Sequence, residues 1–304
     1  MRKIAFVFSG QGAQLPGMGK DLYDHSPAAR TVFELADRIR PTTSEQCFYA
    51  TKEEINKTIN TQPCLFTVGL AAAEALREKG ILPEQLAGFS LGEIPAIAFS
   101  GMLDPEDAFR LVCKRAEEMQ KCASQSDGAM AAVIGMENGQ VEETCIAHGV
   151  YPVNYNFKSQ LVIAGEREKL LSAVDALKTM GGRVILLPVS GAFHTPLMKE
   201  ASSELAKYVS NLNFNKPTTP IYSNITGELY TDKVGTCISD QVKSPVRWQT
   251  TIENMALSGV NTFIEVGVGK TLCGFIKKTL TDVTVFNVED QKSLEYTISS
   301  LNGG

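Results

Sequence analysis

Short apolar runs alternate with amphipathic segments along the first part of the chain. Residues 4–8 and 86–89 are apolar runs, which is typical of strands that are buried on both faces. In residues 28–38, 64–79 and 105–122, apolar positions recur every three or four residues, and this spacing predicts helices. The mixture of buried strands and amphipathic helices predicts an α/β layer arrangement.

The pattern changes near residue 127. Six segments follow in the order strand, helix, strand, strand, helix, strand, at residues 130–134, 141–148, 150–156, 160–164, 167–180 and 183–188. This βαββαβ order is that of a ferredoxin-like unit. The α/β pattern then resumes, with expected strands at 220–223 and 262–266 and the helices that accompany them. We therefore predict that residues 127–191 form a ferredoxin-like subdomain inserted into an α/β unit made of residues 1–126 and 192–304.

Composition narrows the class of protein. The 304 residues are 43% hydrophobic with a formal net charge of -5, and no apolar run reaches the roughly 18 residues of a membrane span. No stretch combines Lys and Arg with stacking aromatic residues, which argues against nucleic acid as a partner. The seven cysteines are odd in number and lack metal-ligand spacing. Residues 1–4 lead straight into a strand with no room for a signal peptide. We expect a soluble, cytoplasmic enzyme without a metal.

A serine in a glycine-rich turn is the first candidate for chemistry. Residues 88–92 read Gly-Phe-Ser-Leu-Gly, a G-x-S-x-G pattern that places Ser90 on a strained turn between strand and helix. Side chains at the two glycine positions would collide with backbone there. Pro95 is tolerated only near a helix start, so the helix must begin close to Ser90, with the Leu91 amide facing whatever binds the serine. A purely structural turn is the alternative.

A serine hydroxyl needs a base, and the chain has three histidines. His25 precedes a Ser-Pro helix start and is expected at the surface. His148 ends a predicted helix just before a glycine, where a structural role is expected. His194 lies instead in an apolar stretch of small residues. We predict that His194 is the base for Ser90, with a core histidine as the alternative. These two residues flank the inserted unit, so the active site is expected in the cleft between the units.

One charge lies on the apolar face of a predicted helix. Residues 104–107 (Asp-Pro-Glu-Asp) are a strong helix start, and the helix that follows has one broad apolar face. Arg115 falls inside that face. A buried guanidinium is costly without an anionic partner, and its fork matches a carboxylate. Arg115 therefore indicates either a structural ion pair with an Asp or Glu, or a site for a substrate carboxylate.

Taken in order, these motifs resemble those of malonyl-CoA:acyl carrier protein transacylases and the related acyltransferase domains of polyketide synthases. The matching segments are residues 8–14 (Phe-Ser-Gly-Gln-Gly-Ala-Gln), 61–63 (Thr-Gln-Pro), 88–93, 115–120, 154–156, 160–165, 191–198, 223–227 and 265–270. The resemblance covers nearly the whole chain. It implies that the α/β unit is an α/β-hydrolase-like catalytic subdomain and that the chain is an acyltransferase of fatty acid or polyketide biosynthesis.

The resemblance also implies catalytic roles. Ser90 would be acylated by malonyl-CoA, and His194 would act first as general base and then as general acid. The backbone amides of Gln11 and Leu91 would form the oxyanion hole. The backbone carbonyl of Gln241 would orient the histidine, in place of the acid of an ordinary triad.

Substrate binding is assigned on the same grounds. Arg115 would hold the malonyl carboxylate, while Gln62 and Asn156 would line the cleft, with Phe89 and Phe193 also on the substrate side. Family members usually have a histidine where this chain has Phe89. The acyl pocket is therefore expected to be more apolar here, and the preference for malonyl less strict.

The implied partners are malonyl-CoA and an acidic acyl carrier protein. Because the phosphopantetheine arm belongs to the carrier, no metal or organic cofactor is expected. The carrier would meet a basic rim near the cleft, for which Lys270, Lys277 and Lys278 are candidates, although a solvated helix face explains them equally well. A monomer is expected.

Other functions remain open at this point. A serine acyl-CoA thioesterase could use Ser90 and His194, but it would predict a triad acid and would not need an inward arginine. A trans-acting polyketide acyltransferase with relaxed extender-unit choice is another alternative. A catalytically silent docking module is disfavoured by the intact Ser90, His194 and Arg115.

Overall fold

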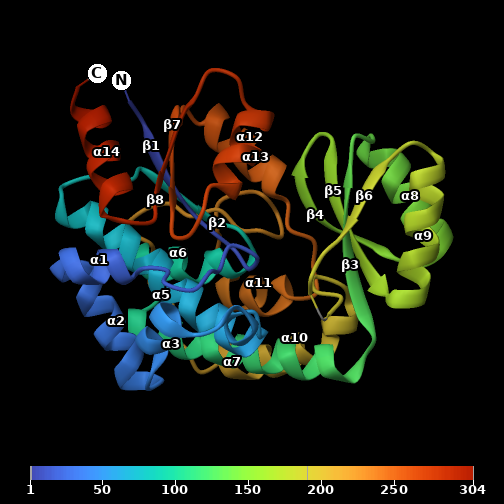
Figure 1. Ribbon diagram of the computed structural model, residues 1–304, viewed down its shortest axis with the longest axis horizontal. Helices are drawn as coiled ribbons and strands as arrows, with labels where there is room; N and C mark the ends of the chain where they lie inside the picture. Colours follow the sequence, from blue (N-terminus) through green and yellow to red (C-terminus); the bar gives the residue numbers. More distant parts are fainter. Residues whose placement is uncertain (1, 190, 304) are drawn as a thin grey trace.

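The computed structural model describes residues 2–189 and 191–303 and contains two separate sheets (Figure 1). Met1, Ser190 and Gly304 belong to the predicted units 1–126, 127–191 and 192–304 but lie outside the described residues. The mixed α/β class, with one parallel and one antiparallel sheet, is confirmed.

The first stretch of chain carries two strands and most of the helices around them. Its elements are β1 (Ile4–Phe8), α1 (Lys20–His25), α2 (Pro27–Ile39), α3 (Thr43–Tyr49), α4 (Lys52–Ile55), α5 (Thr58–Glu78), β2 (Gln85–Gly88), the 3-10 turn η1 (Ser90–Gly92), α6 (Glu93–Phe99) and α7 (Pro105–Gln125). The final stretch adds η2 (Pro196–Met198), α10 (Lys199–Val209), α11 (Val234–Gln241), α12 (Trp248–Leu257), β7 (Thr262–Val266), α13 (Thr271–Thr279), β8 (Thr284–Val288) and α14 (Gln291–Asn302).

Both stretches contribute to one parallel sheet of order β2-β1-β7-β8. Strands β1 and β7 are almost wholly buried, which explains why β1 is a continuous apolar run, whereas β7 also buries the polar residues Thr262 and Glu265. Phe8 pairs with Gly88 on one side and Val266 on the other. The ends of three strands therefore meet at the start of η1.

Two expectations for this sheet were incomplete. Residues 220–223 form only isolated bridges, from Ile221 to Leu86 and from Tyr222 to Leu229, because a turn closed by the Gly227 amide on the Ser223 carbonyl (2.8 Å) interrupts the segment. Strand β8 was not predicted, because it is a half-exposed edge strand with polar residues at positions 284 and 287.

The middle of the chain forms the antiparallel sheet. Its elements are β3 (Gly128–Ile134), α8 (Asn138–His148), β4 (Tyr151–Phe157), β5 (Gln160–Glu166), α9 (Arg167–Thr179) and β6 (Arg183–Leu186), and the strand order is β4-β5-β3-β6. These elements follow the predicted order strand, helix, strand, strand, helix, strand. Figure 1 shows α8 and α9 covering the side of this sheet that faces away from the parallel sheet.

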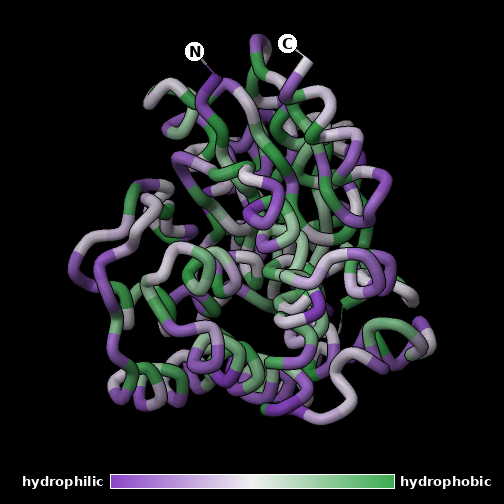
Figure 2. The backbone as a smooth tube through the Cα atoms, turned by 90° about the vertical axis from the view of Figure 1, so that its left-hand side faces the viewer, coloured by the Kyte–Doolittle hydropathy of each residue, from purple (hydrophilic) through white to green (hydrophobic). Residues whose placement is uncertain are grey.

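Both faces of the antiparallel sheet are buried. Because side chains alternate along a strand, Ala131 and Val133 of β3 pack with α8 and α9, whereas Met130 and Ala132 join the core of the first unit. The β4 edge is also bonded to the first unit, since the amide of Val246 donates to the Val153 carbonyl over 2.8 Å. Figure 2 shows hydrophobic residues concentrated in the interior of the molecule and hydrophilic residues in many of the outer turns.

The turn after β2 depends on close approach of backbone to backbone. A Cβ atom at Gly88 would lie 2.0 Å from the carbonyl carbon of Gly92, and one at Gly92 would lie 2.2 Å from the Phe8 carbonyl oxygen. No real Cβ tolerates such distances. The two glycines of the G-x-S-x-G pattern are thus required by packing, and they seat the start of η1 against β1.

We predict that Gly88→Ala lowers the melting temperature by roughly 6 °C or more, because overpacking against fixed backbone costs about 3 kcal/mol or more. Gly139→Ala is the matched control, since a Cβ there meets nothing within 4 Å and the residue lies in α8. It should leave the melting temperature unchanged or slightly raised. Thermal unfolding of the two variants measures the difference, and equal melting temperatures would contradict this account of the turn.

Candidate active site

Ser90 and His194 meet directly. The Oγ atom of Ser90 lies 2.7 Å from Nε2 of His194, although the residues are 104 positions apart in the chain. Both have left-handed backbone, with φ of 53° for Ser90 and 63° for His194. A non-glycine residue rarely adopts this conformation, and such strain clusters at functional sites. The packing around η1 and η2 holds both residues in place.

Two carbonyl groups set the orientation of the His194 ring. Its Nδ1 atom lies 2.9 Å from the carbonyl oxygen of Gln241 and 3.2 Å from that of Ser244. A carbonyl can only accept, so we assign the ring proton to Nδ1. Nε2 is then unprotonated and accepts the hydrogen bond of the Ser90 hydroxyl, as a general base must.

The environment keeps this imidazole neutral. Burial, together with the positive charge of Arg115, lowers the pKa of His194 to about 4, while the two carbonyl contacts oppose the shift. The neutral ring is therefore the dominant form at neutral pH, and it can take a proton from Ser90.

Arg115 of α7 is fully buried, as its place in the apolar stripe predicted. Its Nη1 donates to the Gln62 side-chain oxygen and its Nη2 to the Gln241 side-chain oxygen, both over 2.7 Å. Nη2 also lies 3.3 Å from Ser90 Oγ. Among the described residues no carboxylate pairs with this guanidinium, and its buried Nε has no hydrogen-bond partner.

The absence of a direct ion pair bears on the two hypotheses for Arg115. The expected structural ion pair is not formed in the described part of the chain. Burial lowers the pKa of Arg115 to about 10, so the group is still charged at neutral pH. A buried cation held only by neutral amide oxygens, next to a nucleophile, is suited to receive an anionic group of a substrate.

Two residues without a predicted role complete the frame of the turn. The side chain of Asn224 accepts from the Ser90 amide over 2.7 Å and donates to the Gly88 carbonyl over 2.6 Å. Glu93, the first residue of α6, is buried, and burial raises its pKa to about 7. Its carboxylate accepts from the side chain of Gln241. A charged residue at the start of the wholly buried segment 93–99 was the sequence signal for this role.

The two amides expected to form the oxyanion hole lie on neighbouring loops. Gln11 follows β1, and its amide forms no hydrogen bond with the rest of the described chain. Leu91 is the residue after Ser90 in η1, where the first amides of a helical turn lack internal partners. The side chain of Gln11 donates to Thr58 Oγ1 over 3.2 Å, and the residue lines the space between the two units.

A cavity of about 250 Å³ lies between the two sheets beside these loops. Gln11 and Phe89 line it from the first unit, and Asn156 and Gln160 line it from β4 and β5. Asn156 donates to the Gln160 side chain over 3.0 Å and keeps a buried oxygen without a partner in the described residues. Phe89 packs edge-on against Trp248, with ring centres 5.5 Å apart. A wider groove of about 1170 Å³ continues from Gln11 toward the solvent.

The remaining candidate residues lie elsewhere. Phe193 packs into the main core and lines neither the cavity nor the groove. The side chains of Lys270, Lys277 and Lys278 are exposed on and just before α13. Lys278 sits 4.7 Å above the ring centre of Phe157 in β4.

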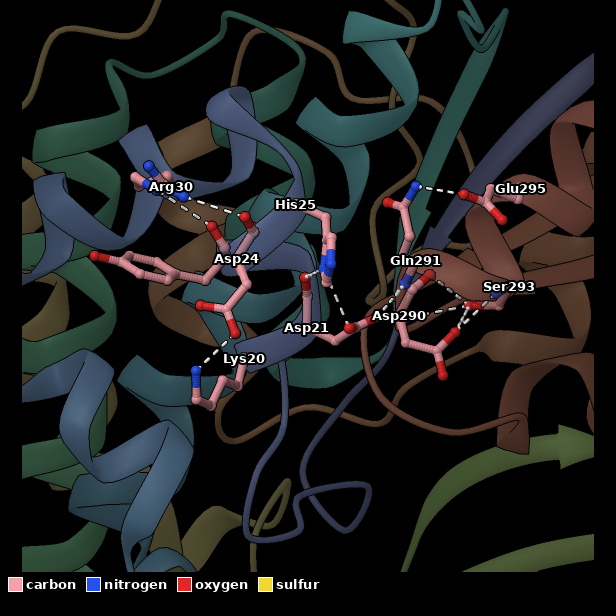
Figure 3. Close-up of polar contacts among 10 residues, drawn as sticks. Lys20, Asp21, Asp24, His25, Arg30, Asp290, Gln291, Ser293 and Glu295 are labelled. Carbon is pink, nitrogen blue, oxygen red and sulfur yellow. Dashed lines mark hydrogen bonds and ion pairs between the residues drawn. The ribbon is translucent and has the colours of Figure 1, made fainter.

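The other two histidines have local contacts, as the sequence predicted. His25 is exposed on α1, where its Nδ1 lies 3.2 Å from the Asp21 carboxylate, and that carboxylate also accepts from the amide of Gln291 at the start of α14 (Figure 3). His148 ends α8 and contacts the hydroxyl of Ser172 over 3.0 Å. Neither faces Ser90.

Residues 2–189 and 191–303 show neither a metal centre nor a membrane-spanning helix. No group of three or more His, Cys, Asp or Glu side chains within that part could hold a metal ion. No helix there combines the length and apolar character that a membrane crossing requires.

Comparisons with known proteins agree with this geometry. The model of the acyl transferase domain family matches residues 5–297. A malonyl CoA-acyl carrier protein transacylase of Bacillus subtilis is 38% identical, with 99% of this chain and 98% of the relative covered. The crystal structure of the transacylase of that name from Clostridium perfringens superposes with a TM-score of 0.96 at 40% identity, covering 99% and 98% of the two chains. A malonyl-transacylase solved in complex with its type II PKS acyl-carrier protein has a TM-score of 0.94 at 33% identity, covering 99% and 100%.

The lowered pKa of His194 predicts how the reactivity of Ser90 depends on pH. Because a neutral imidazole can accept the proton of Ser90, the rate of Ser90 modification by an uncharged phosphonylating reagent should be flat from about pH 8 to about pH 5. It should be half-maximal near the pKa of about 4. In Arg115→Met the half-maximal pH should rise, because a positive charge that disfavours the imidazolium is lost.

Arg110→Met is the matched control, since Arg110 lies on the exposed side of the same helix. It should leave the profile unchanged. A wild-type profile centred near the ordinary histidine value of about 6.5 would show that the ring is not desolvated as the structure indicates.

Proposed function

The chain belongs to the acyl transferase family, and on this premise we propose that it transfers a malonyl group from malonyl-CoA to the phosphopantetheine thiol of an acyl carrier protein, through an acyl-serine intermediate. Transfer of this kind supplies fatty acid or polyketide biosynthesis. The observation that supports the malonyl substrate is the buried Arg115 guanidinium beside Ser90, which no carboxylate of the described residues neutralises.

The first half-reaction loads the enzyme. Ser90 Oγ attacks the thioester carbonyl of malonyl-CoA while its proton passes to Nε2 of His194, from which it lies 2.7 Å in the resting site. The backbone amides of Gln11 and Leu91 stabilise the oxyanion of the tetrahedral intermediate. The C–S bond then breaks, and the sulfur of CoA leaves with the proton that His194 carried.

The second half-reaction reverses these roles. The thiol of the carrier's phosphopantetheine arm gives its proton to His194 and attacks the malonyl-serine ester. The ester C–O bond breaks, and His194 returns the proton to Ser90. All bond changes occur between the two thiols, the acyl group and these two side chains, so the reaction needs no metal or organic cofactor.

His194 works here without a carboxylate partner. Its Nδ1 contacts are the carbonyl groups of Gln241 and Ser244, and a carbonyl fixes the ring proton without adding a charge. An ordinary serine hydrolase would place an acid at this position. The geometry therefore favours transfer by the family's histidine and carbonyl pair over the thioesterase alternative.

The same site suggests how the acyl group is selected. Arg115 would bind the free carboxylate of the malonyl group, with Gln62 and Gln241 holding the guanidinium. Phe89 and Asn156, which line the cavity, would contact the acyl and pantetheine portions. Phe89 offers no hydrogen bond, so selectivity rests on Arg115.

We further propose two subdomains with the predicted bounds. The strand order β4-β5-β3-β6 with helices α8 and α9 on one face is the arrangement of a ferredoxin-like subdomain, over residues 127–191. Residues 1–126 and 192–304 would form the α/β-hydrolase-like catalytic subdomain, whose parallel sheet carries Ser90 on a sharp turn after β2. The cavity between the sheets would then be the substrate channel.

The carrier protein would dock near this channel. Carrier proteins are acidic, and the exposed Lys270, Lys277 and Lys278 on the α13 side provide positive charge beside residues that line the cavity. We propose that the enzyme acts as a cytoplasmic monomer toward this partner, without nucleic acid or membrane.

The chemistry of the pair predicts the effect of removing its base. His194→Ala should lower the rate of acylation by malonyl-CoA at least about a hundredfold, within the usual range for loss of a general base. Acylation reactions quenched at a series of times and analysed by intact-protein mass spectrometry measure this rate. Ser90→Ala should form no adduct, whereas His148→Ala should react normally, because the His148 side chain bonds to Ser172 at the end of α8 and not to Ser90.

Two outcomes would contradict the assignment. A malonyl adduct mapped to a residue other than Ser90 would exclude it as the nucleophile. Release of malonate without transfer to added carrier protein would identify a thioesterase instead.

Arg115 predicts the choice of acyl group. A charged hydrogen bond shielded from water contributes roughly 1.5 to 3 kcal/mol, so malonyl-CoA should be preferred over acetyl-CoA by about two orders of magnitude. Arg115→Ala should erase most of this preference. Phe89→His should reduce tolerance for the α-methyl group of methylmalonyl-CoA. The measurement is kcat/KM for the three thioesters in each variant, and equal values for acetyl and malonyl in the wild type would remove the role of Arg115.

A further inference from the structure

Gln241 contacts both His194 and Arg115, the first through its backbone carbonyl and the second through its side chain. Its backbone carbonyl accepts from His194 Nδ1 over 2.9 Å, and its side-chain oxygen accepts from Arg115 Nη2 over 2.7 Å. The side-chain amide nitrogen donates to the Ser90 carbonyl over 2.8 Å and to the carboxylate of Glu93. Every polar atom of this buried side chain is therefore used.

The amide of Gln241 could in principle be turned by 180°, so something must decide which end faces Arg115. In the reversed orientation its NH₂ group would face the guanidinium, which can only donate. Its oxygen would then face the Glu93 carboxylate and the Ser90 carbonyl, which act as acceptors. The Glu93 carboxylate and the Ser90 carbonyl behind the amide therefore both favour the orientation that presents an oxygen to Arg115.

A glutamine side chain at position 93 could not replace both acceptor oxygens of the Glu93 carboxylate. One carboxylate oxygen accepts from the Asn224 amide over 2.9 Å and from the Tyr230 hydroxyl over 2.7 Å. The other accepts from Gln241. The backbone and side-chain amides can only donate here, so a glutamine at position 93 would have to set its own NH₂ group against one of them.

From these contacts we propose that Glu93 is a positioning residue for acyl-group selection: through the side-chain amide of Gln241 it aims the Arg115 guanidinium at the substrate carboxylate. The proposal rests on the proposed malonyl transfer. Glu93 touches neither Ser90 Oγ nor Arg115 through a hydrogen bond, so it acts through Gln241. When ionised, it also supplies a negative charge near Arg115 without occupying the place that a substrate carboxylate takes.

This role differs from that of a general structural anchor in one measurable respect. A loosened scaffold would slow the acylation of Ser90 by every thioester. A misaimed guanidinium would slow acylation only by thioesters with a free carboxylate, because acetyl-CoA makes no use of Arg115. The ratio of malonyl to acetyl acylation rates separates the two cases, and it needs no carrier protein.

The experiment compares Glu93→Gln with Tyr230→Phe. Glu93→Gln replaces the buried carboxylate by an amide, whereas Tyr230→Phe removes one of its hydrogen bonds and leaves the carboxylate with its contacts to Gln241 and Asn224. We expect Glu93→Gln to reduce the malonyl-to-acetyl ratio by about tenfold or more. Tyr230→Phe should keep the ratio within about twofold of the wild-type value, even where its melting temperature falls.

A double substitution tests the path of action. In an Arg115→Ala background, Glu93→Gln should produce no further change in the ratio, because two residues acting through one group are not additive. An equal loss of malonyl and acetyl acylation in Glu93→Gln would overturn the proposal. So would a further fall of the ratio when Arg115 is absent.

If Glu93→Gln does not fold, Gln241→Leu provides a second test of the same proposal. This change removes the amide but retains the carbonyl that His194 contacts, so the ratio should fall as in Glu93→Gln. A wild-type ratio in Gln241→Leu would overturn the role of Glu93. Failure of the proposed function is distinguishable, since the wild type itself would then not be acylated by malonyl-CoA.

Discussion

The arrangement of the site follows from the need to keep one positive charge inside the protein without neutralising it. Removing a guanidinium from water is costly, and proteins usually offset this cost with a carboxylate in contact. Here Arg115 is bonded instead to the side-chain oxygens of Gln62 and Gln241. The Glu93 carboxylate lies behind the side-chain amide of Gln241, and its charge lowers the free-energy cost of burying the guanidinium. Helices α5, α6, α7 and α11 all contribute a side chain to this arrangement, which explains why they converge behind the turn at Ser90.

The same charge accounts for the state of the base. Arg115 and burial together hold the His194 ring neutral, and a carboxylate at Nδ1 would work against this effect by stabilising the imidazolium. Carbonyl acceptors orient the ring and leave its charge state to the surroundings. The substrate-binding cation and the missing triad acid are therefore parts of one electrostatic arrangement.

Much of the fold and part of the site could be predicted from the sequence, because they depend on local patterns. The buried strands, the order of elements in residues 127–191 and the inward Arg115 all follow from the spacing of apolar positions. Strand β8 was missed because an edge strand that is partly exposed lacks a continuous apolar run. Residues 220–223 were expected to pair as a strand, but the turn that follows them limits their pairing to single bridges.

The interior partners could not be read from local pattern, because they are set by tertiary contact. Gln241 lies 47 positions from His194 and 126 from Arg115, and only the resemblance to a family pointed to its carbonyl. Asn224 and Glu93 stood in recognised motifs, and the apolar residues after Glu93 indicated that it is buried, but neither sequence context identified the Ser90 amide or the Gln241 side chain as the partner. Paired polar groups in a core leave no periodic trace in the sequence.

Because Gln241 contacts His194 through its backbone and Arg115 through its side chain, the two contacts can change separately during evolution. Every amino acid carries a backbone carbonyl, so no substitution at position 241 deletes the acceptor that orients His194. Substitutions there alter the side chain, which bonds to Arg115, to Glu93 and to the Ser90 carbonyl, and leave that acceptor in place. Evolution can therefore explore new acyl specificities at this position without first losing the proton-transfer step, which makes the preferred acyl group a more readily changed trait than the chemistry itself.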